Sequence, residues 1–250
     1  MSASSMCGTV VVAGASSQIG IFLLPKLVSA GYRVIALSRG AGKAPATLDS
    51  ALAWVHPAAV VNNENPIGSA FDWLISAAPP SLTAELIVRN PGIRKVIQFT
   101  TTSVLTKRQS ANTGERALMS QIAGEESRLK ALGEKHGVAM VILRPTLIYG
   151  CGMDQNISRL WRWGNRSGFI PVARQSGGLR QPVHADDLAG LAVQSLQAET
   201  GEFLESAACG GSTLAYREML AATARCCRRK TRVIPVPESL FASALQAYSW

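Results

Sequence analysis

The chain has 250 residues, of which 47% are hydrophobic and 16% charged, and its mean hydropathy is +0.15. This composition excludes a disordered or collagen-like chain, and the length allows one large core or two small ones. No apolar run reaches the roughly 18 residues of a membrane helix, and residues 1–9 lack the basic and apolar regions of a secretory signal. We therefore expect a cytoplasmic globular protein without a membrane partner.

The formal net charge of +9 favours anionic partners. The basic residues are spread along the chain, and their one cluster, residues 225–232, has no interleaved aromatic residues and matches no nucleic-acid-binding motif. This disfavours nucleic acid and favours a phosphorylated small molecule or a solvated face. The five cysteines show no Cys-x-x-Cys or Cys/His spacing, so we expect neither a disulfide framework nor a metal site.

Short buried strands alternate with helices up to about residue 145. The sequence predicts strands at 9–13, 32–38, 73–77, 95–100 and 138–143, and helices at 21–30, 82–88 and 114–136. Residues 51–61 form a weaker strand candidate, interrupted by Pro57 and followed by a loop at 62–66. This alternation predicts an α/β fold with a Rossmann-type, doubly wound parallel sheet.

The chain changes character after about residue 150. Loops rich in glycine and arginine and a Trp/Arg segment come first, and helices are predicted at 186–197, 216–227 and 238–250. We therefore expect a Rossmann domain over residues 1–150, to which parts of 178–200 return, and a smaller portion over residues 151–250.

A Gly/Ser turn follows the first predicted strand and leads into a helix. Backbone N–H groups at such a turn point toward a phosphate, and the helix dipole adds to their attraction. The first glycine allows a tight turn and the last lets helix and strand pack closely, while a serine replaces the middle glycine. We expect a nucleotide phosphate here; the alternative is an ordinary glycine turn. The candidate residues are Gly14, Ser16, Ser17, Gln18, Ile19 and Gly20.

The end of the second predicted strand distinguishes between the two nicotinamide dinucleotides. An NAD site needs a carboxylate there, which accepts hydrogen bonds from the ribose hydroxyls and repels a 2′-phosphate. Ser38 and Arg39 occupy this place, and a hydroxyl beside a guanidinium suits a phosphate. NADP is therefore the favoured cofactor, with NAD as the alternative; a merely solvated Arg39 is the non-functional interpretation.

Five segments in order carry a resemblance to a known family. They are ValAlaGlyAlaSerSerGlnIleGly (12–20), SerAlaAlaPro (76–79), PheThrThrThrSerVal (99–104), IleLeuArgProThrLeuIleTyrGly (142–150) and LeuArgGlnProValHisAlaAspAspLeuAla (179–189). Together they resemble the extended short-chain dehydrogenases/reductases of the NAD-dependent epimerase/dehydratase group. The resemblance implies a dinucleotide at the carboxyl ends of the strands and a nucleotide-sugar-like substrate against the smaller portion, residues 151–250.

Several roles follow from the resemblance by position. Ala77, Ala78, Thr100 and Pro145 would contact the cofactor. Thr101 stands where the family has a catalytic Ser or Thr that hydrogen-bonds the substrate oxygen. The diphosphate of the substrate would be bound by Asn156 and by Arg180, whose planar guanidinium suits it. An ion pair of Arg180 with Asp186 or Asp187 is the open alternative.

The chain departs from the family at its Tyr-x-x-x-Lys pair, in which Tyr transfers the proton. None of the four tyrosines is followed by a lysine four residues later. Alignment of Gly124 and Glu125 with the family's GlyGlu puts Ala117 and Gln121 at the pair's positions, and neither can transfer a proton. The chain thus resembles the atypical branch of the superfamily.

Other side chains could supply the proton. Tyr149 and Lys107 are candidates, with packing and a loop cation as their structural interpretations. His184 is better explained as a structural residue beside the aspartates, and nothing in the sequence indicates an activated Cys151.

Two functions remain open at this stage. The first is an NADP-dependent enzyme that reduces, epimerises or dehydrates a nucleotide sugar or a similar phosphorylated carbonyl compound by hydride transfer. The second is a non-catalytic NADP-binding sensor or scaffold, which the missing pair favours. The candidates Thr101, Asn156 and Arg180 favour the enzyme. In the family more chain follows a segment like 235–250, so a short form and a truncated one both remain open, as do monomer and homodimer.

Overall fold

The computed structural model describes residues 7–40, 51–61, 71–199 and 201–237. The loop expected at 62–66 and the helix expected at 238–250 lie outside these residues. The chain divides into two compact units. Unit 1 comprises residues 1–145 and 185–208, and unit 2 comprises residues 146–184 and 209–250.

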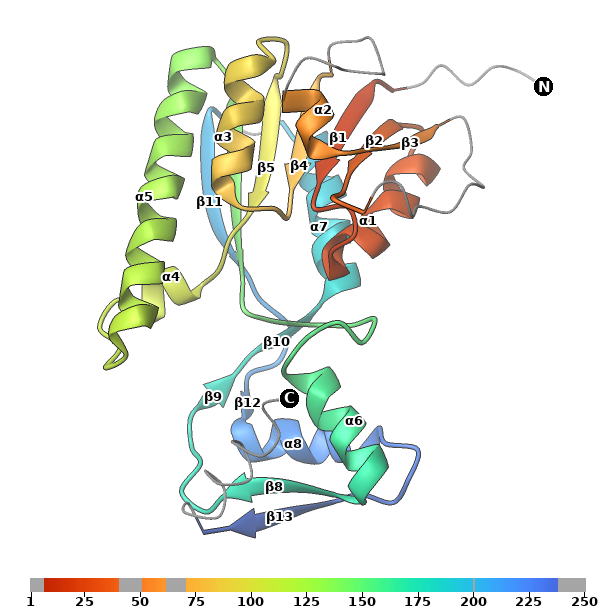
Figure 1. Ribbon diagram of the computed structural model, residues 1–250, viewed down its shortest axis with the longest axis vertical. Coiled ribbons are helices and arrows are strands. Elements are labelled where there is room, and N and C mark those ends of the chain that lie inside the picture. The colour runs from red at the N-terminus through yellow and green to blue at the C-terminus, as the bar shows by residue number, and fades with distance from the viewer. Residues whose placement is uncertain (1–6, 41–50, 62–70, 200, 238–250) are drawn as a thin grey trace, which may run out of the picture. The chain divides into compact units, whose positions relative to one another are not determined.

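Unit 1 is built on a seven-stranded sheet in the order β11-β6-β5-β4-β1-β2-β3, and every neighbouring pair is parallel (Figure 1). The strands are β1 (Thr9–Ala13), β2 (Arg33–Leu37), β3 (Leu52–Val55), β4 (Trp73–Ser76), β5 (Lys95–Phe99), β6 (Ala139–Pro145) and β11 (Phe203–Ala208). The order reverses between β1 and β4, which is the place where open α/β sheets bind their ligands.

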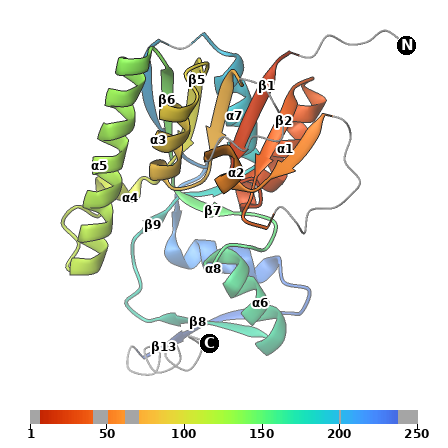
Figure 2. The ribbon, with the colours of Figure 1, turned by 45° about the horizontal axis from the view of Figure 1, so that its top comes forward.

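Helices cover both faces of this sheet (Figures 1 and 2). They are α1 (Gln18–Ser29), α2 (Pro57–Val61), α3 (Pro80–Arg89), α4 (Ser103–Thr106), α5 (Thr113–His136) and α7 (Ala185–Gln197). Helices α1 and α7 pack on each other on one side, and α3 packs on α5 on the other. Lys95 in β5 donates hydrogen bonds from Nζ to the carbonyls of Ser195 and Leu196 at 3.1 and 3.2 Å, which satisfies the C-terminus of α7.

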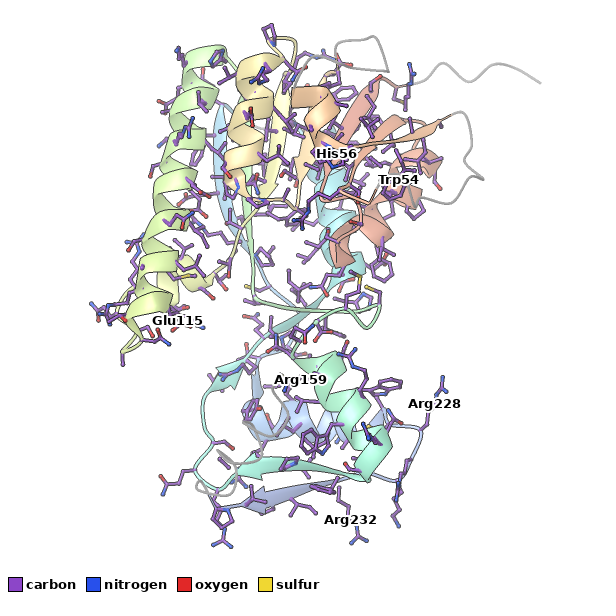
Figure 3. The ribbon with its side chains drawn as sticks, viewed as in Figure 1. Trp54, His56, Glu115, Arg159, Arg228 and Arg232 are labelled. Atoms are coloured by element: carbon purple, nitrogen blue, oxygen red, sulfur yellow. The ribbon has the colours of Figure 1, made fainter. Side chains whose placement is uncertain are left out.

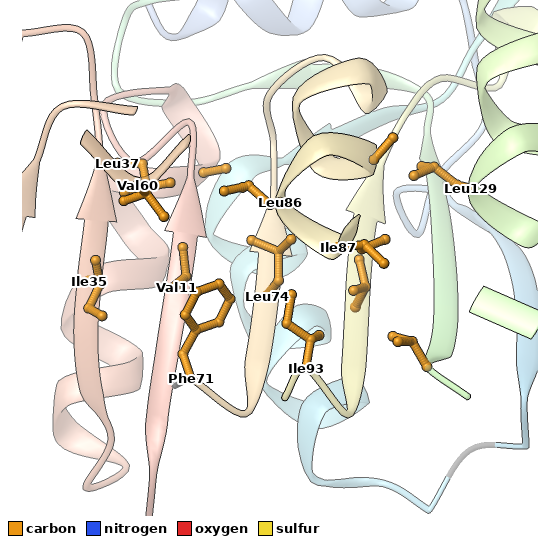
Figure 4. Close-up of a cluster of buried hydrophobic side chains, with 14 of the residues drawn as sticks. Val11, Ile35, Leu37, Val60, Phe71, Leu74, Leu86, Ile87, Ile93 and Leu129 are labelled. Carbon is orange, nitrogen blue, oxygen red and sulfur yellow. The ribbon is translucent and has the colours of Figure 1, made fainter. Parts of the chain in front are cut away.

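Continuous runs of Val, Ile and Leu form the strands because helices bury both faces of the sheet. Figure 4 shows one resulting cluster, which contains Val11, Ile35 and Leu74 from the strands, Leu86 from α3 and, at one end, Leu129 from α5. All five are at most 1% exposed. This core fixes the carboxyl ends of β1, β2 and β4 relative to one another.

A buried ion pair ties α5 to the sheet. The Arg144 guanidinium donates from Nη2 to Glu126 at 2.7 Å and to Glu205 at 2.9 Å. The Glu126 side chain is 6% exposed and that of Glu205 50%. Hydrogen bonding to Glu126 raises the pKa of Arg144 above its ordinary value against the opposing effect of burial. The guanidinium is therefore a permanent charge that needs its partners.

The predicted Rossmann-type α/β fold is confirmed. The strand predicted over 51–61 is wrong beyond Val55, because Pro57 begins the short helix α2 there. Proline fits a first helical turn, where its missing N–H costs nothing. The seventh strand, β11, was not predicted; it pairs with β6 at the sheet edge.

Unit 2 combines two helices with short strands. Its elements are β7 (Leu147–Tyr149), α6 (Ile157–Ser167), β8 (Phe169–Ala173), β9 (Leu179–Arg180), β10 (Pro182–His184), β12 (Leu214–Ala215), α8 (Tyr216–Arg225) and β13 (Arg232–Val236). The strands form three two-stranded sheets, β10-β7, β12-β9 and β13-β8. A small core around Ile170 and Leu220 holds α8 against β8. The Trp/Arg segment of the sequence is helix α6.

None of the described helices is both long and apolar enough to cross a membrane.

Candidate functional site

The turn after β1 has the backbone that a bound phosphate requires. Gly14 has φ +75°, a backbone conformation that glycine adopts easily and that residues with a Cβ rarely adopt. A Cβ at Gly14 would lie 2.9 Å from the carbonyl carbon of Ala77 and 3.1 Å from the nitrogen of Ala78. A Cβ at Gly20 would overlap the carbonyl oxygen of Ala15. Both glycines therefore hold the turn tightly against β4 and α1.

Ser17 explains why the middle glycine of the motif is absent. It is the N-cap of α1, and its Oγ accepts a hydrogen bond from Gly20 N at 3.1 Å. The cap leaves the backbone N–H groups of Gln18 and Ile19, at the positive end of the helix dipole, for an anion. The buried Gln18 Oε1 has no hydrogen-bond partner within the described chain. The helix end is thus polar and ready for a ligand.

The Ala77–Ala78 loop opposite the turn is held from beneath by a buried network that the sequence did not reveal. Thr83 Oγ1 lies 2.7 Å from Ser76 Oγ and 2.6 Å from Gln98 Oε1, and Gln98 donates from Nε2 to the Ala78 carbonyl at 3.0 Å. Ser76, Thr83 and Gln98 are each 0% exposed. The sequence signal for this network was the presence of one polar residue in each of two apolar strands, Ser76 in β4 and Gln98 in β5.

At the end of β2, polar groups face the same space. Ser38 Oγ donates to Ser16 Oγ at 3.0 Å and accepts from Gly40 N at 3.2 Å, while Arg39 is exposed. Ser38 N also donates to the Val55 carbonyl at 3.1 Å, so the chain end of β3, with His56, runs beside it. Figure 3 labels His56, which sequence reasoning did not single out.

A cavity of about 480 Å³ unites these features. Its lining residues come from the turn, the end of β2, α2 and the loop after β4: Gly14, Ser16, Ser17, Leu37, Ser38, Arg39, Pro57, Ala77, Ala78, Pro79, Ser81 and Leu82. Arg39 is the one charged residue among these described lining residues. A turn without side chains, a capped helix end and an apolar slot fit a dinucleotide, and we call this space the unit 1 cavity.

Three other candidates lie near the ends of β5 and β6. Thr100 N donates to the Leu143 carbonyl at 2.9 Å, while its buried Oγ1 has no hydrogen-bond partner within the described chain. Thr101 Oγ1 accepts from Ser103 N at 3.2 Å, which leaves its own O–H to donate. The Pro145 carbonyl accepts from Thr102 Oγ1 at 3.1 Å and thereby ties the two strand ends together.

The acid/base pair of the family has no counterpart on α5. Ala117 and Gln121 are both exposed, and Gln121 Nε2 donates to Glu125 at 3.1 Å. Lys107 forms an ion pair with Glu115, with 2.5 Å between Nζ and Oε1. That interaction lowers the pKa of Glu115 through the Lys107 hydrogen bond. Lys107 is therefore engaged with a carboxylate at the start of α5.

Unit 2 brings Asn156 and Arg180 to one cavity of about 310 Å³. The Arg180 guanidinium lies over the Tyr216 ring at 5.3 Å from its centre, a cation–π contact that orients its planar face. Arg159 and Trp163 of α6 line the same cavity; Figure 3 labels Arg159. Neither had been predicted, although Asn156, Arg159 and Trp163 follow helical spacing. A cavity with two arginines and two aromatic rings suits a nucleoside diphosphate.

Tyr149 belongs to another part of unit 2. Its ring packs edge to face on His184, with centres 5.1 Å apart, and a Cβ at Gly150 would meet that imidazole at 2.9 Å. Tyr149 and Cys151 line a second cavity of about 530 Å³ between α6 and α8. His184 is thus a packing partner of Tyr149, and Asp186 forms an ion pair with Lys26 at 2.9 Å.

No family model and no curated protein matches this sequence. The fold does match solved structures. MoeE5 in complex with UDP-glucuronic acid and NAD is 18% identical with a TM-score of 0.70, over 94% of this chain and 92% of that one. UDP-N-acetylglucosamine 4-epimerase from Methanobrevibacter ruminantium M1, in complex with UDP-N-acetylmuramic acid, is 14% identical with a TM-score of 0.71, over 94% and 87%.

A third solved structure, the Bordetella bronchiseptica enzyme WbmF in complex with NAD⁺, is 13% identical with a TM-score of 0.72, over 93% of this chain and 82% of that one. These identities are low, but the likeness covers both units of the chain. The resemblance to the epimerase/dehydratase group is therefore confirmed at the level of the fold: this chain has the fold of the nucleotide-sugar epimerases.

Proposed function

We propose that the chain is an NADP-dependent enzyme that acts on a nucleotide sugar, or on a similar phosphorylated carbonyl compound, by hydride transfer. The observation that carries the proposal is the unit 1 cavity, where the Gly14 turn, the capped end of α1 and the cation Arg39 line one space. Three solved neighbours with nucleotide-sugar or NAD ligands share the fold.

Each part of the dinucleotide has residues suited to it. The N–H groups of Gln18 and Ile19 bind the pyrophosphate, and Ala77–Ala78 provides the apolar wall. Arg39 binds the 2′-phosphate, and Ser38, whose O–H donates to Ser16 Oγ, leaves the Ser16 O–H free to donate to the same phosphate. When bound, the nicotinamide supplies or accepts the hydride. Thr101 O–H donates to the substrate oxygen, where negative charge develops.

The substrate proposal rests on unit 2. Arg180, held over Tyr216, and Arg159 bind the diphosphate, and Asn156 adds an amide beside them. A cytoplasmic location stays part of the proposal, and a homodimer stays an open alternative to a monomer.

Cofactor preference tests the proposal directly. We expect calorimetry to show tighter binding of NADP⁺ than of NAD⁺. Arg39→Asp should weaken NADP⁺ binding by about 10- to 100-fold, because a charge-assisted hydrogen bond is replaced by repulsion, and should favour NAD⁺. Arg128→Asp, which changes an exposed arginine on α5, is the matched control and should leave both affinities unchanged. Equal affinities of the unmutated chain for NADP⁺ and NAD⁺ would contradict the proposed preference for NADP.

Turnover separates the enzyme from the alternative, a non-catalytic NADP-binding sensor or scaffold, which the missing Tyr and Lys favour. General acid catalysis contributes about 10²- to 10⁴-fold, so we expect cofactor binding with turnover of UDP-sugars slower by about that factor than in enzymes with the pair. Thr101→Val should lower the residual rate. Rapid turnover that survives Thr101→Val, Tyr149→Phe and Lys107→Ala would show that the active site is misplaced.

A further inference from the structure

The charge of the protein is concentrated in unit 2. The residues assigned to unit 2 include eleven of the 25 lysines and arginines but only three of the 16 aspartates and glutamates. Unit 2 thus carries +8 of the formal charge of +9, and unit 1 is almost neutral. Such segregation creates a strong local field that attracts anions to one part of the molecule.

Most of these cations gather at one end of unit 2. Arg228 N donates to Asn165 Oδ1 at 2.8 Å, Thr231 Oγ1 donates to the Gly164 carbonyl at 3.1 Å, and Arg232 N donates to the Gly168 carbonyl at 3.1 Å. These bonds bind the segment between α8 and β13 to the last turn of α6. We call this region the basic end; its exposed cations are Arg162, Arg166, Arg225, Arg228, Arg229, Lys230 and Arg232.

Internal structure accounts for few of these charges. Of the seven cations, Arg162 donates from Nη1 to the Gly152 carbonyl at 2.7 Å, and Arg229 donates from Nη1 to the Arg166 carbonyl at 3.2 Å. The side chains of the other five have neither a hydrogen bond nor an ion pair within the described chain, and Figure 3 shows Arg228 and Arg232 pointing away from the ribbon. Like charges held together without counter-charges destabilise a fold. The clustering of these unpaired cations therefore indicates that an anion from outside the chain binds here.

The chemistry of the basic end favours a lipid headgroup layer over the bases of a nucleic acid. Its amide, Asn165, is occupied, since Nδ2 donates to the Trp161 carbonyl at 2.8 Å. The Trp161 ring lines the cavity between α6 and α8, and its Nε1 donates to the Cys226 carbonyl at 3.1 Å, so this ring is engaged within unit 2 and is not a platform for stacking on bases. Beside them Ile234 is 42% exposed and lies two residues after Arg232, on the same face of β13. An apolar side chain next to cations fits a lipid headgroup layer.

We propose that the basic end of unit 2 docks on an anionic phospholipid surface, with its cations among the lipid phosphates and Ile234 at the depth of the headgroups. Clusters of four to eight Lys and Arg bind such surfaces, whereas a membrane-spanning helix is not needed. The inference is independent of the proposed enzymatic activity. It departs from the sequence-based expectation of no membrane partner, which was argued from the apolar runs that a spanning helix or a secretory signal needs and not from a charged surface.

Vesicle sedimentation of the full chain tests the proposal. The probes are vesicles of phosphatidylcholine with about 30% phosphatidylglycerol, vesicles of phosphatidylcholine alone, and a 20-base-pair DNA duplex, at low and at physiological salt. The test variant is Arg228→Gln with Lys230→Gln and Arg232→Gln, and the matched control is Arg128→Gln with Lys130→Gln and Lys135→Gln on α5. Circular dichroism and NADP⁺ binding report on the fold of both.

We expect the unmutated chain to bind the anionic vesicles and not the neutral ones, with affinity falling as salt rises. The test variant should bind about a hundredfold more weakly, since each cation contributes about fivefold, while the control changes little. Ile234→Ser should weaken binding to vesicles without changing binding to DNA. Absence of binding to anionic vesicles, equal loss in both triple variants, or tighter binding to DNA than to vesicles would overturn the proposal.

Discussion

Replacement of Gly14 by valine should severely weaken cofactor binding while leaving the sheet intact. The added Cβ would lie 2.9 Å from the Ala77 carbonyl carbon, a backbone atom at the end of β4, so the turn after β1 has to shift away from it. Valine also strongly disfavours φ near +75°. Together these effects should weaken NADP⁺ binding by about a hundredfold or more, as measured by calorimetry.

The control is Gly124→Val on α5, where a Cβ would meet nothing within 4 Å. This variant adds the same side chain and should leave NADP⁺ binding unchanged. Circular dichroism should show both variants folded. A folded Gly14→Val chain with ordinary affinity would mean that the phosphate site lies elsewhere.

The second large effect concerns stability. Glu126→Ala should lower the free energy of unfolding of unit 1 by about 3–5 kcal/mol, because it leaves the buried Arg144 guanidinium without its main partner. Urea denaturation followed by circular dichroism measures this change.

Glu205→Ala is the matched comparison, since it removes the other carboxylate bound to the same guanidinium. The Glu205 side chain is half exposed, so its loss should cost about 1 kcal/mol or less. Equal destabilisation by both variants would show that burial does not set the strength of this network.

Most of the architecture of unit 1 could be predicted from the sequence because the signals there are local. Each of its buried strands is a short apolar run, and Gly14, Ser17 and Gly20 lie within seven residues of one another. The turn could therefore be predicted residue by residue. The edge strand β11 could not, because Leu204 is 43% exposed and the strand lacks an apolar run.

Several elements of unit 2 were not predicted from the sequence, for different reasons. Strands β9 and β12 contain two residues each, too few for any periodicity. Helix α6 could have been predicted, because Arg159, Arg162 and Arg166 recur at helical spacing. Trp161 and Trp163 lie between these arginines, so the segment was described only as rich in Trp and Arg. The hydrogen-bond networks around Arg144 and Gln98 join side chains from elements far apart in the chain. Such long-range hydrogen bonds leave no pattern in a single sequence by which they could be predicted.

The return of the chain to unit 1 after its excursion through unit 2 has a consequence for synthesis on the ribosome. Helix α1 packs on α7, and the outer edge of β6 is covered by β11. The first cover is complete only at Gln197, where α7 ends, and the second only at Ala208, where β11 ends. A nascent chain of residues 1–184 therefore presents an apolar helix face and an open strand edge, both of which invite aggregation. Unit 1 therefore stays incomplete while residues 146–184 of unit 2 are translated, and it can close only when residues 185–208 have followed.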